Sequence, residues 1–62
     1  MAELAIVRVI LVDDAVLVRE GIARLLAEEG VEVVAQLCDA TTVVDSVRAS
    51  APDAVVLDVR MP

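Results

Sequence analysis

The chain has 62 residues, with eleven acidic and five basic side chains, no histidine and a formal net charge of −6. This length allows one small domain, and the negative charge argues against direct binding to nucleic acid or to an anionic membrane. No apolar run approaches the ~20 residues that cross a bilayer, and Met1-Ala2-Glu3 lacks the basic start of a signal peptide. We therefore expect a cytoplasmic protein. The single cysteine, Cys38, is expected to be a small apolar filler.

The first predicted element is a strand at Val7–Val12. After Arg8, whose side chain is largely aliphatic, its residues are all apolar and include Val and Ile, which favour strands. Apolar and polar residues do not alternate along it. Such a run is typical of a strand that is covered on both faces of a parallel sheet. Asp13 and Asp14 follow directly. Because ligands bind at the carboxyl ends of strands in open parallel sheets, this strand predicts a site at its end.

A helix is predicted from Val16 to Glu29, and Gly30 is expected to end it by taking a positive φ angle. Gly21 lies inside this helix, where it could allow a close approach to the sheet. The residues expected to share the buried face are Val18, Ile22, Leu25 and Leu26.

The segment Val31–Leu37 alternates in part between apolar and polar residues, which predicts a half-exposed edge strand. Asp39 is then expected to cap the N-terminus of a second helix at about Ala40–Ala49, and Pro52 prevents its continuation. The last strand is predicted at Ala54–Leu57, buried on both faces. The order is β-α-β-α-β, with spacing that permits right-handed parallel crossovers.

The first and third predicted strands both end in acid, at Asp13-Asp14 and at Asp58. If these strands are parallel neighbours, three carboxylates converge at one end of the sheet and need a compensating cation or protonation. Mg²⁺ fits such a set of hard oxygen ligands, and a carboxylate can attack phosphorus as a nucleophile. The alternative is that Asp13 or Asp14 caps the first helix and Asp58 is a solvated strand end.

Three segments carry a resemblance to a known family: Val9-Ile10-Leu11-Val12-Asp13-Asp14, Leu17-Val18-Arg19-Glu20-Gly21, and Pro52-Asp53-Ala54-Val55-Val56-Leu57-Asp58-Val59-Arg60-Met61-Pro62. Together they resemble the N-terminal half of a bacterial response-regulator receiver domain. They are most similar to receivers that precede a helix-turn-helix DNA-binding output domain. The combination of the acid pair with Asp-Val-Arg-Met-Pro is more specific than either motif alone.

The resemblance implies a partial flavodoxin-like α/β fold with strand order 2-1-3. It also implies a phosphoacceptor module, not itself an enzyme, in which Asp58 receives phosphate from a sensor histidine kinase. Asp14 would bind Mg²⁺ directly and Asp13 would act on the same ion through water. Asp58 and the backbone carbonyl of Arg60 would complete the protein ligands.

Receivers also use a Ser or Thr after strand four and a Lys after strand five, and residues 1–62 reach neither position. We therefore expect a truncated receiver, whose contact with DNA would need an output domain outside this chain. The alternative is an assembly fragment that pairs with a second copy through the free edge of the third strand. A hydrolase is disfavoured, because an Asp-x-Asp pattern and a Gly-rich phosphate loop are both missing from the sequence.

Overall fold

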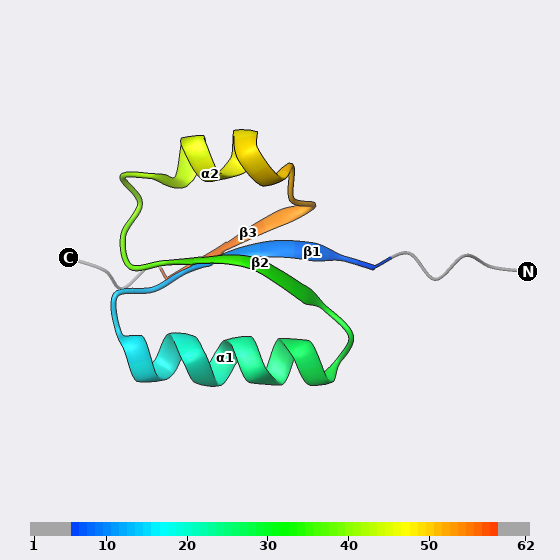
Figure 1. The fold of residues 1–62 in the computed structure, drawn as a ribbon. Coiled ribbons are helices and arrows are strands. Elements are labelled where there is room, and N and C mark those ends of the chain that lie inside the picture. Colours follow the sequence, from blue (N-terminus) through cyan, green and yellow to red (C-terminus); the bar gives the residue numbers. More distant parts are fainter. Residues whose placement is uncertain (1–5, 59–62) are drawn as a thin grey trace, which may run out of the picture.

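A parallel three-stranded sheet separates two helices in the computed structural model, which describes residues 6–58 (Figure 1). The strand order is β2-β1-β3, with α1 on one face and α2 on the other. This confirms the predicted β-α-β-α-β order and the partial flavodoxin-like fold. The elements are β1 (Arg8–Val12), α1 (Val16–Glu28), β2 (Glu32–Leu37), α2 (Val43–Ser50) and β3 (Ala54–Leu57).

The core of the described chain lies on β1. Its residues from Val9 to Val12 are buried, because β1 pairs with β2 on one side and with β3 on the other. Ile10, for example, lies opposite Ala35 of β2 and Val55 of β3, and its side chain is 0% exposed. The central position of the strand thus explains its unbroken apolar run.

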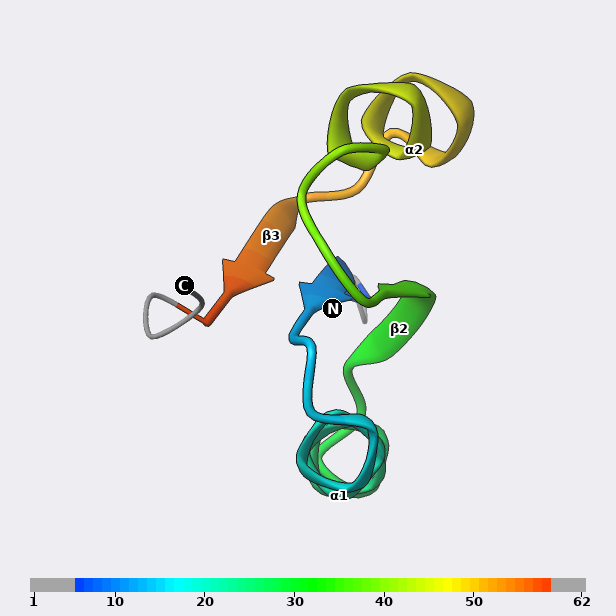
Figure 2. The same cartoon turned by 90° about the vertical axis from the view of Figure 1, so that its left-hand side faces the viewer.

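Strand β3 is exposed, whereas the sequence predicted a strand that is buried on both faces. All four of its residues are exposed, with Val55, Val56 and Leu57 retaining 38–48% of their accessible surface. β3 is an edge strand, and Figure 2 shows α1 lying beneath β1 and β2 and not beneath β3. An apolar run indicates a strand that can be buried. Whether other elements cover the strand depends on its position in the sheet.

Helix α1 ends as predicted, at a glycine with a left-handed backbone. Gly30 has φ +86°, its N–H donates to Ala27 at 3.0 Å, and the N–H of Val31 donates to Leu26 at 2.9 Å. This pair of bonds is the Schellman motif, which satisfies the last carbonyls of a helix. The prediction for Gly21 was wrong, because a Cβ added there would meet no atom within 4 Å.

Substitution by alanine should therefore change the free energy of unfolding in opposite directions at the two glycines. Gly21→Ala should raise the free energy of unfolding by up to about 1 kcal/mol, since the position is helical and open. Gly30→Ala should lower it by about 1 kcal/mol, since L-residues are strained at its φ. Urea unfolding followed by circular dichroism checks both. A loss of stability in Gly21→Ala would show that the helix needs a glycine there.

The prediction of which residues form the buried face of α1 is partly wrong. Ile22 and Leu26 are half-buried as predicted, whereas Val18 and Leu25 are 43% and 63% exposed. The half-buried positions of this helix are Arg19, Ile22, Ala23 and Leu26. These recur at the helical spacing of three, four and seven, so the face that meets the sheet is turned toward Arg19.

Asp39 does not cap the second helix, which begins three residues later than predicted, at Val43. Thr42 occupies the N-cap position without a side-chain bond. Oδ1 of Asp39 instead accepts from the Oγ1 and the backbone N–H of Thr41, at 2.5 and 2.8 Å. These bonds hold the pKa of Asp39 below its ordinary value. Aspartate often satisfies the backbone two residues on in this way, which favours a turn over an immediate helix.

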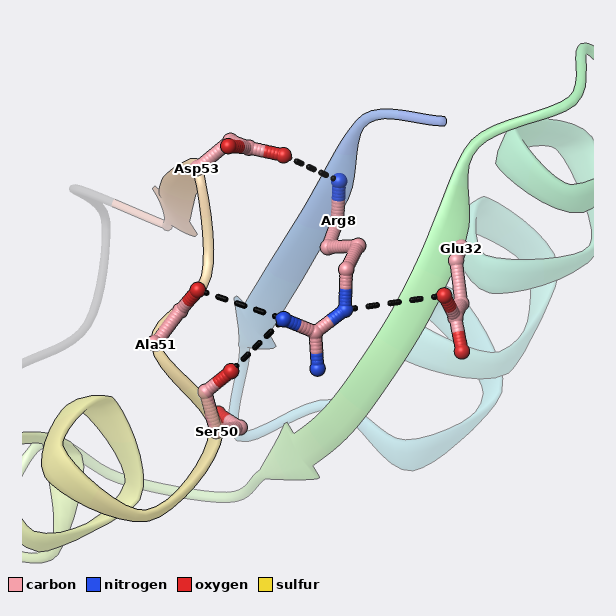
Figure 3. Close-up of polar contacts among 5 residues, drawn as sticks. All are labelled: Arg8, Glu32, Ser50, Ala51 and Asp53. Carbon is pink, nitrogen blue, oxygen red and sulfur yellow. Dashed lines mark hydrogen bonds and ion pairs between the residues drawn. The ribbon is translucent and has the colours of Figure 1, made fainter. Parts of the chain in front are cut away.

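Arg8 joins three elements at the amino end of the sheet (Figure 3). Its Nη1 donates to the carbonyls of Ser50 and Ala51 at 2.7 and 3.2 Å, and its Nε lies 3.6 Å from Oε1 of Glu32. Its backbone N–H donates to Oδ2 of Asp53 at 2.8 Å. The guanidinium thus satisfies carbonyls at the C-terminal end of α2, where a cation is favoured by the helix dipole.

Neither described helix is long and apolar enough to span a membrane.

Candidate functional site

Three aspartates from two strands meet at the carboxyl end of the sheet. Asp13 and Asp14 follow β1, and Asp58 follows β3. The register places Val12 opposite Leu57, and the N–H of Asp58 donates to the Val12 carbonyl at 3.1 Å. One carboxylate oxygen from each aspartate lies within 4.8 Å of the others. The parallel pairing of β1 and β3 therefore brings together acids that are more than forty residues apart in the chain.

The three acids differ in exposure. Asp13 is buried, with 2% of its surface accessible, Asp58 is half-buried, and Asp14 is exposed. Oδ1 of Asp13 accepts from the N–H of Ala15 at 2.9 Å, while its own N–H donates to the Leu37 carbonyl at 3.0 Å. Asp13 thus bonds to the N–H of Ala15, the N-cap residue of α1, and it also belongs to the acid cluster. No side chain caps α1, so the helix-capping alternative is wrong for Asp13.

The acid cluster suits a small divalent cation. Carboxylate oxygens are ligands that Mg²⁺ prefers, at about 2.1 Å, so that two ligands on opposite sides of one ion are ~4.2 Å apart. The three oxygens lie within 4.8 Å of one another, a limit about 0.6 Å wider than this span, so small side-chain movements would bring them to one ion. A cation would also offset the repulsion among three crowded carboxylates. The fourth predicted ligand, the Arg60 carbonyl, lies outside the described residues.

A cavity of about 220 Å³ adjoins Asp13 and Asp58. Apart from these two acids its lining is aliphatic, from Leu11, Val12, Ile22, Val56 and Leu57. The cluster therefore has an apolar wall on one side and solvent at Asp14 on the other. Charges beside an apolar wall interact more strongly than charges in bulk water. A larger hollow of about 510 Å³ lies between α1 and β2, and none of the three acids lines it.

Reasoning from the sequence missed Arg19. Its Nη1 donates to the backbone carbonyl of Asp13 at 2.8 Å, and its Nε donates to Oε1 of Gln36 on β2 at 3.3 Å. The spacing of Arg19 from Ile22, Ala23 and Leu26 was the available signal, because it places the arginine on the face that meets the sheet. Arg19 thus connects α1 and β2 to the backbone of the acid cluster.

Known proteins resemble this chain over most of its length. A protein-glutamate methylesterase/protein-glutamine glutaminase of Anaeromyxobacter dehalogenans is 46% identical over 57 residues, which are 90% of this chain and 16% of the relative. Response regulator GacA of Pseudomonas viridiflava is 44% identical over 57 residues, 90% of this chain and 27% of that protein. Transcriptional regulatory protein PdtaR of Mycobacterium tuberculosis is 38% identical over 55 residues, which are 89% of this chain and 27% of that protein.

The chain therefore spans between about a sixth and about a quarter of these relatives. The family profile described as "Response regulator receiver domain" matches residues 9–62. This match includes β1 from its second residue, the other two strands, both helices and all three aspartates of the acid cluster. The chain belongs to the response regulator receiver domain family.

Proposed function

We propose that this chain is a phosphoacceptor module of two-component signalling, in which Asp58 takes a phosphoryl group from a sensor histidine kinase in the cytoplasm. Asp13, Asp14, Asp58 and the Arg60 carbonyl would hold Mg²⁺ beside it. The observation that carries the proposal is the convergence of three carboxylates at the end of β1 and β3 in a chain of the receiver family.

The chemistry needs a nucleophile and charge neutralisation. A carboxylate oxygen of Asp58 attacks the phosphorus in line, forming a P–O bond as the P–N bond of the donor phosphohistidine breaks. The bonding electrons leave with the donor imidazole, which takes a proton. A bound Mg²⁺ supplies positive charge against the phosphoryl oxygens. Asp13, buried and bonded to Ala15, keeps its direction, while half-buried Asp58 stays accessible from solvent.

We further propose that the intact protein controls transcription through an output domain outside residues 1–62. PdtaR is named a transcriptional regulatory protein and GacA a response regulator. The methylesterase relative shows that similar receivers also occur in proteins with another named activity. Contacts with DNA would then belong to the output domain, consistent with the net charge of −6 in this segment.

Acetyl phosphate with Mg²⁺ tests the proposed acceptor. Intact-mass spectrometry should show one added phosphoryl group, peptide mapping should place it on Asp58, and chelation with EDTA should prevent it. Asp58→Asn should reduce labelling to about 1% or less, because an amide lacks the nucleophilic carboxylate oxygen. Asp45→Asn makes the same change on an exposed residue of α2 and should label like wild type. Persistent labelling of Asp58→Asn would remove the assignment.

Self-association is the second candidate, favoured by the exposure of β3. Its three large aliphatic side chains are 38–48% exposed, and within the described sheet it pairs only with β1. An exposed apolar edge strand can pair with the same edge of a second copy. Light scattering over a range of concentrations distinguishes the two candidates, since a monodisperse monomer at high concentration contradicts this one.

A further inference from the structure

We infer that Arg19 is a positioning residue for the acid cluster: its guanidinium holds the peptide between Asp13 and Asp14 and thereby the direction in which the carboxylates face a cation. This inference rests on the proposed function of the cluster as a cation and phosphoryl site. Arg19 bonds to the backbone of the acid cluster and is not one of its three acidic residues.

The backbone of Asp13 is held on both sides of its Cα atom. Its N–H donates to the Leu37 carbonyl at 3.0 Å, and its carbonyl accepts from Nη1 of Arg19 at 2.8 Å. That carbonyl belongs to the peptide that leads into Asp14, so the bond from Arg19 fixes the plane from which Asp14 projects. Asp14 itself is exposed, so the bond from Arg19 acts on the peptide from which its side chain projects.

The second bond of Arg19 fixes the guanidinium itself. Nε donates to Oε1 of Gln36 at 3.3 Å, and Gln36 lies on β2 opposite Leu11 of β1. A guanidinium is planar and carries its donors in a rigid fork, so two acceptors on different elements define its orientation. Arg19 therefore orients the β1–α1 connection relative to the sheet. An aliphatic residue on the same helix face would pack there without setting that direction.

Charge and geometry predict opposite effects on a metal. A guanidinium near a cation site repels the cation, so removing its charge alone would strengthen Mg²⁺ binding. Removing its hydrogen bonds frees the Asp13–Asp14 peptide and would weaken binding. Partners that orient metal ligands typically affect affinity by 10–100-fold. The sign of the change thus separates a positioning role from a purely electrostatic one.

The test titrates Mg²⁺ alone into the full chain by calorimetry. Arg19→Met should weaken binding roughly tenfold, and Gln36→Met should weaken it by a smaller factor. Arg24→Met is the matched control, because Arg24 is an exposed arginine of the same helix that lines the hollow between α1 and β2, away from the acids. Binding by Arg19→Met that is as tight as in Arg24→Met would overturn the inference.

Amide hydrogen exchange of the metal-free protein gives a readout that does not depend on the proposed function. The N–H groups of Asp13 and Ala15 should exchange about tenfold faster in Arg19→Met, while that of Ile10 in the core stays protected. Arg19→Lys retains the charge without the fork and should show the same change to a smaller degree. Unchanged exchange at both amides in these variants contradicts positioning, whereas failure of the wild type to bind Mg²⁺ contradicts only the metal part of the proposed function.

Discussion

Replacing Ile10 with alanine is expected to lower the free energy of unfolding by about 2–5 kcal/mol. Ile10 is 0% exposed and lies between Ala35 and Val55 on the two neighbouring strands, so the substitution leaves a cavity in the middle of the sheet. A domain of this length has roughly 3–9 kcal/mol of stability in total. The substitution should therefore remove a large share of the total stability, and in the fraction of molecules that unfolds the acid cluster is lost with β1.

Urea unfolding followed by circular dichroism measures this loss, and Leu17→Ala is the control. Leu17 is also aliphatic but is 86% exposed on α1, so its truncation should change stability by no more than about 0.5 kcal/mol. Equal effects of the two substitutions would contradict the assignment of the core to β1.

Asp14→Asn is expected to weaken Mg²⁺ binding about 100-fold, which corresponds to ~2.7 kcal/mol. The change keeps the shape of the side chain and removes one of the three negative charges that face the proposed cation. A pair of unit charges 4 Å apart interacts by roughly 4 kcal/mol near a protein surface, and exposure of Asp14 reduces this figure. Calorimetric titration with Mg²⁺ measures the affinity.

The same substitution should make the metal-free protein melt at a higher temperature, because it relieves repulsion within the cluster. Asp45→Asn, the matched change on α2, should alter neither Mg²⁺ affinity nor the repulsion. Lower stability of metal-free Asp14→Asn together with unchanged affinity would mean that Asp14 serves the β1–α1 connection and not a cation.

The sequence predicted the features that depend on short patterns. The unbroken run from Val9 to Val12 indicated a central strand, and Gly30 indicated the end of α1 through its need for a positive φ. The meeting of Asp13, Asp14 and Asp58 followed from two strands that each end in acid, once those strands were taken as parallel neighbours. The first two features follow from a local pattern, whereas the third also requires the pairing of β1 with β3.

Features that depend on the assembled fold could not be predicted in the same way. The exposure of β3 depends on its place at the edge of the sheet, which its four apolar residues do not encode. Arg8 and Arg19 bond to backbone carbonyls, and a side-chain pattern does not show which carbonyls an arginine reaches. For Arg19 the helical spacing indicates only the face on which it lies. Asp39 could cap a helix or close a turn with Thr41, and the local bonds to Thr41 decided between them.

The central claim is that the carboxyl ends of β1 and β3 form one cation site. Mn²⁺ prefers the same oxygen ligands as Mg²⁺ and broadens nuclear magnetic resonance signals of nearby nuclei. At substoichiometric Mn²⁺, we predict broadening of the amide signals of Asp13, Asp14 and Asp58, with little effect on Asp53 at the opposite end of β3. Broadening centred on Asp39 or on Glu28 and Glu29, with Asp58 unaffected, would contradict the claim.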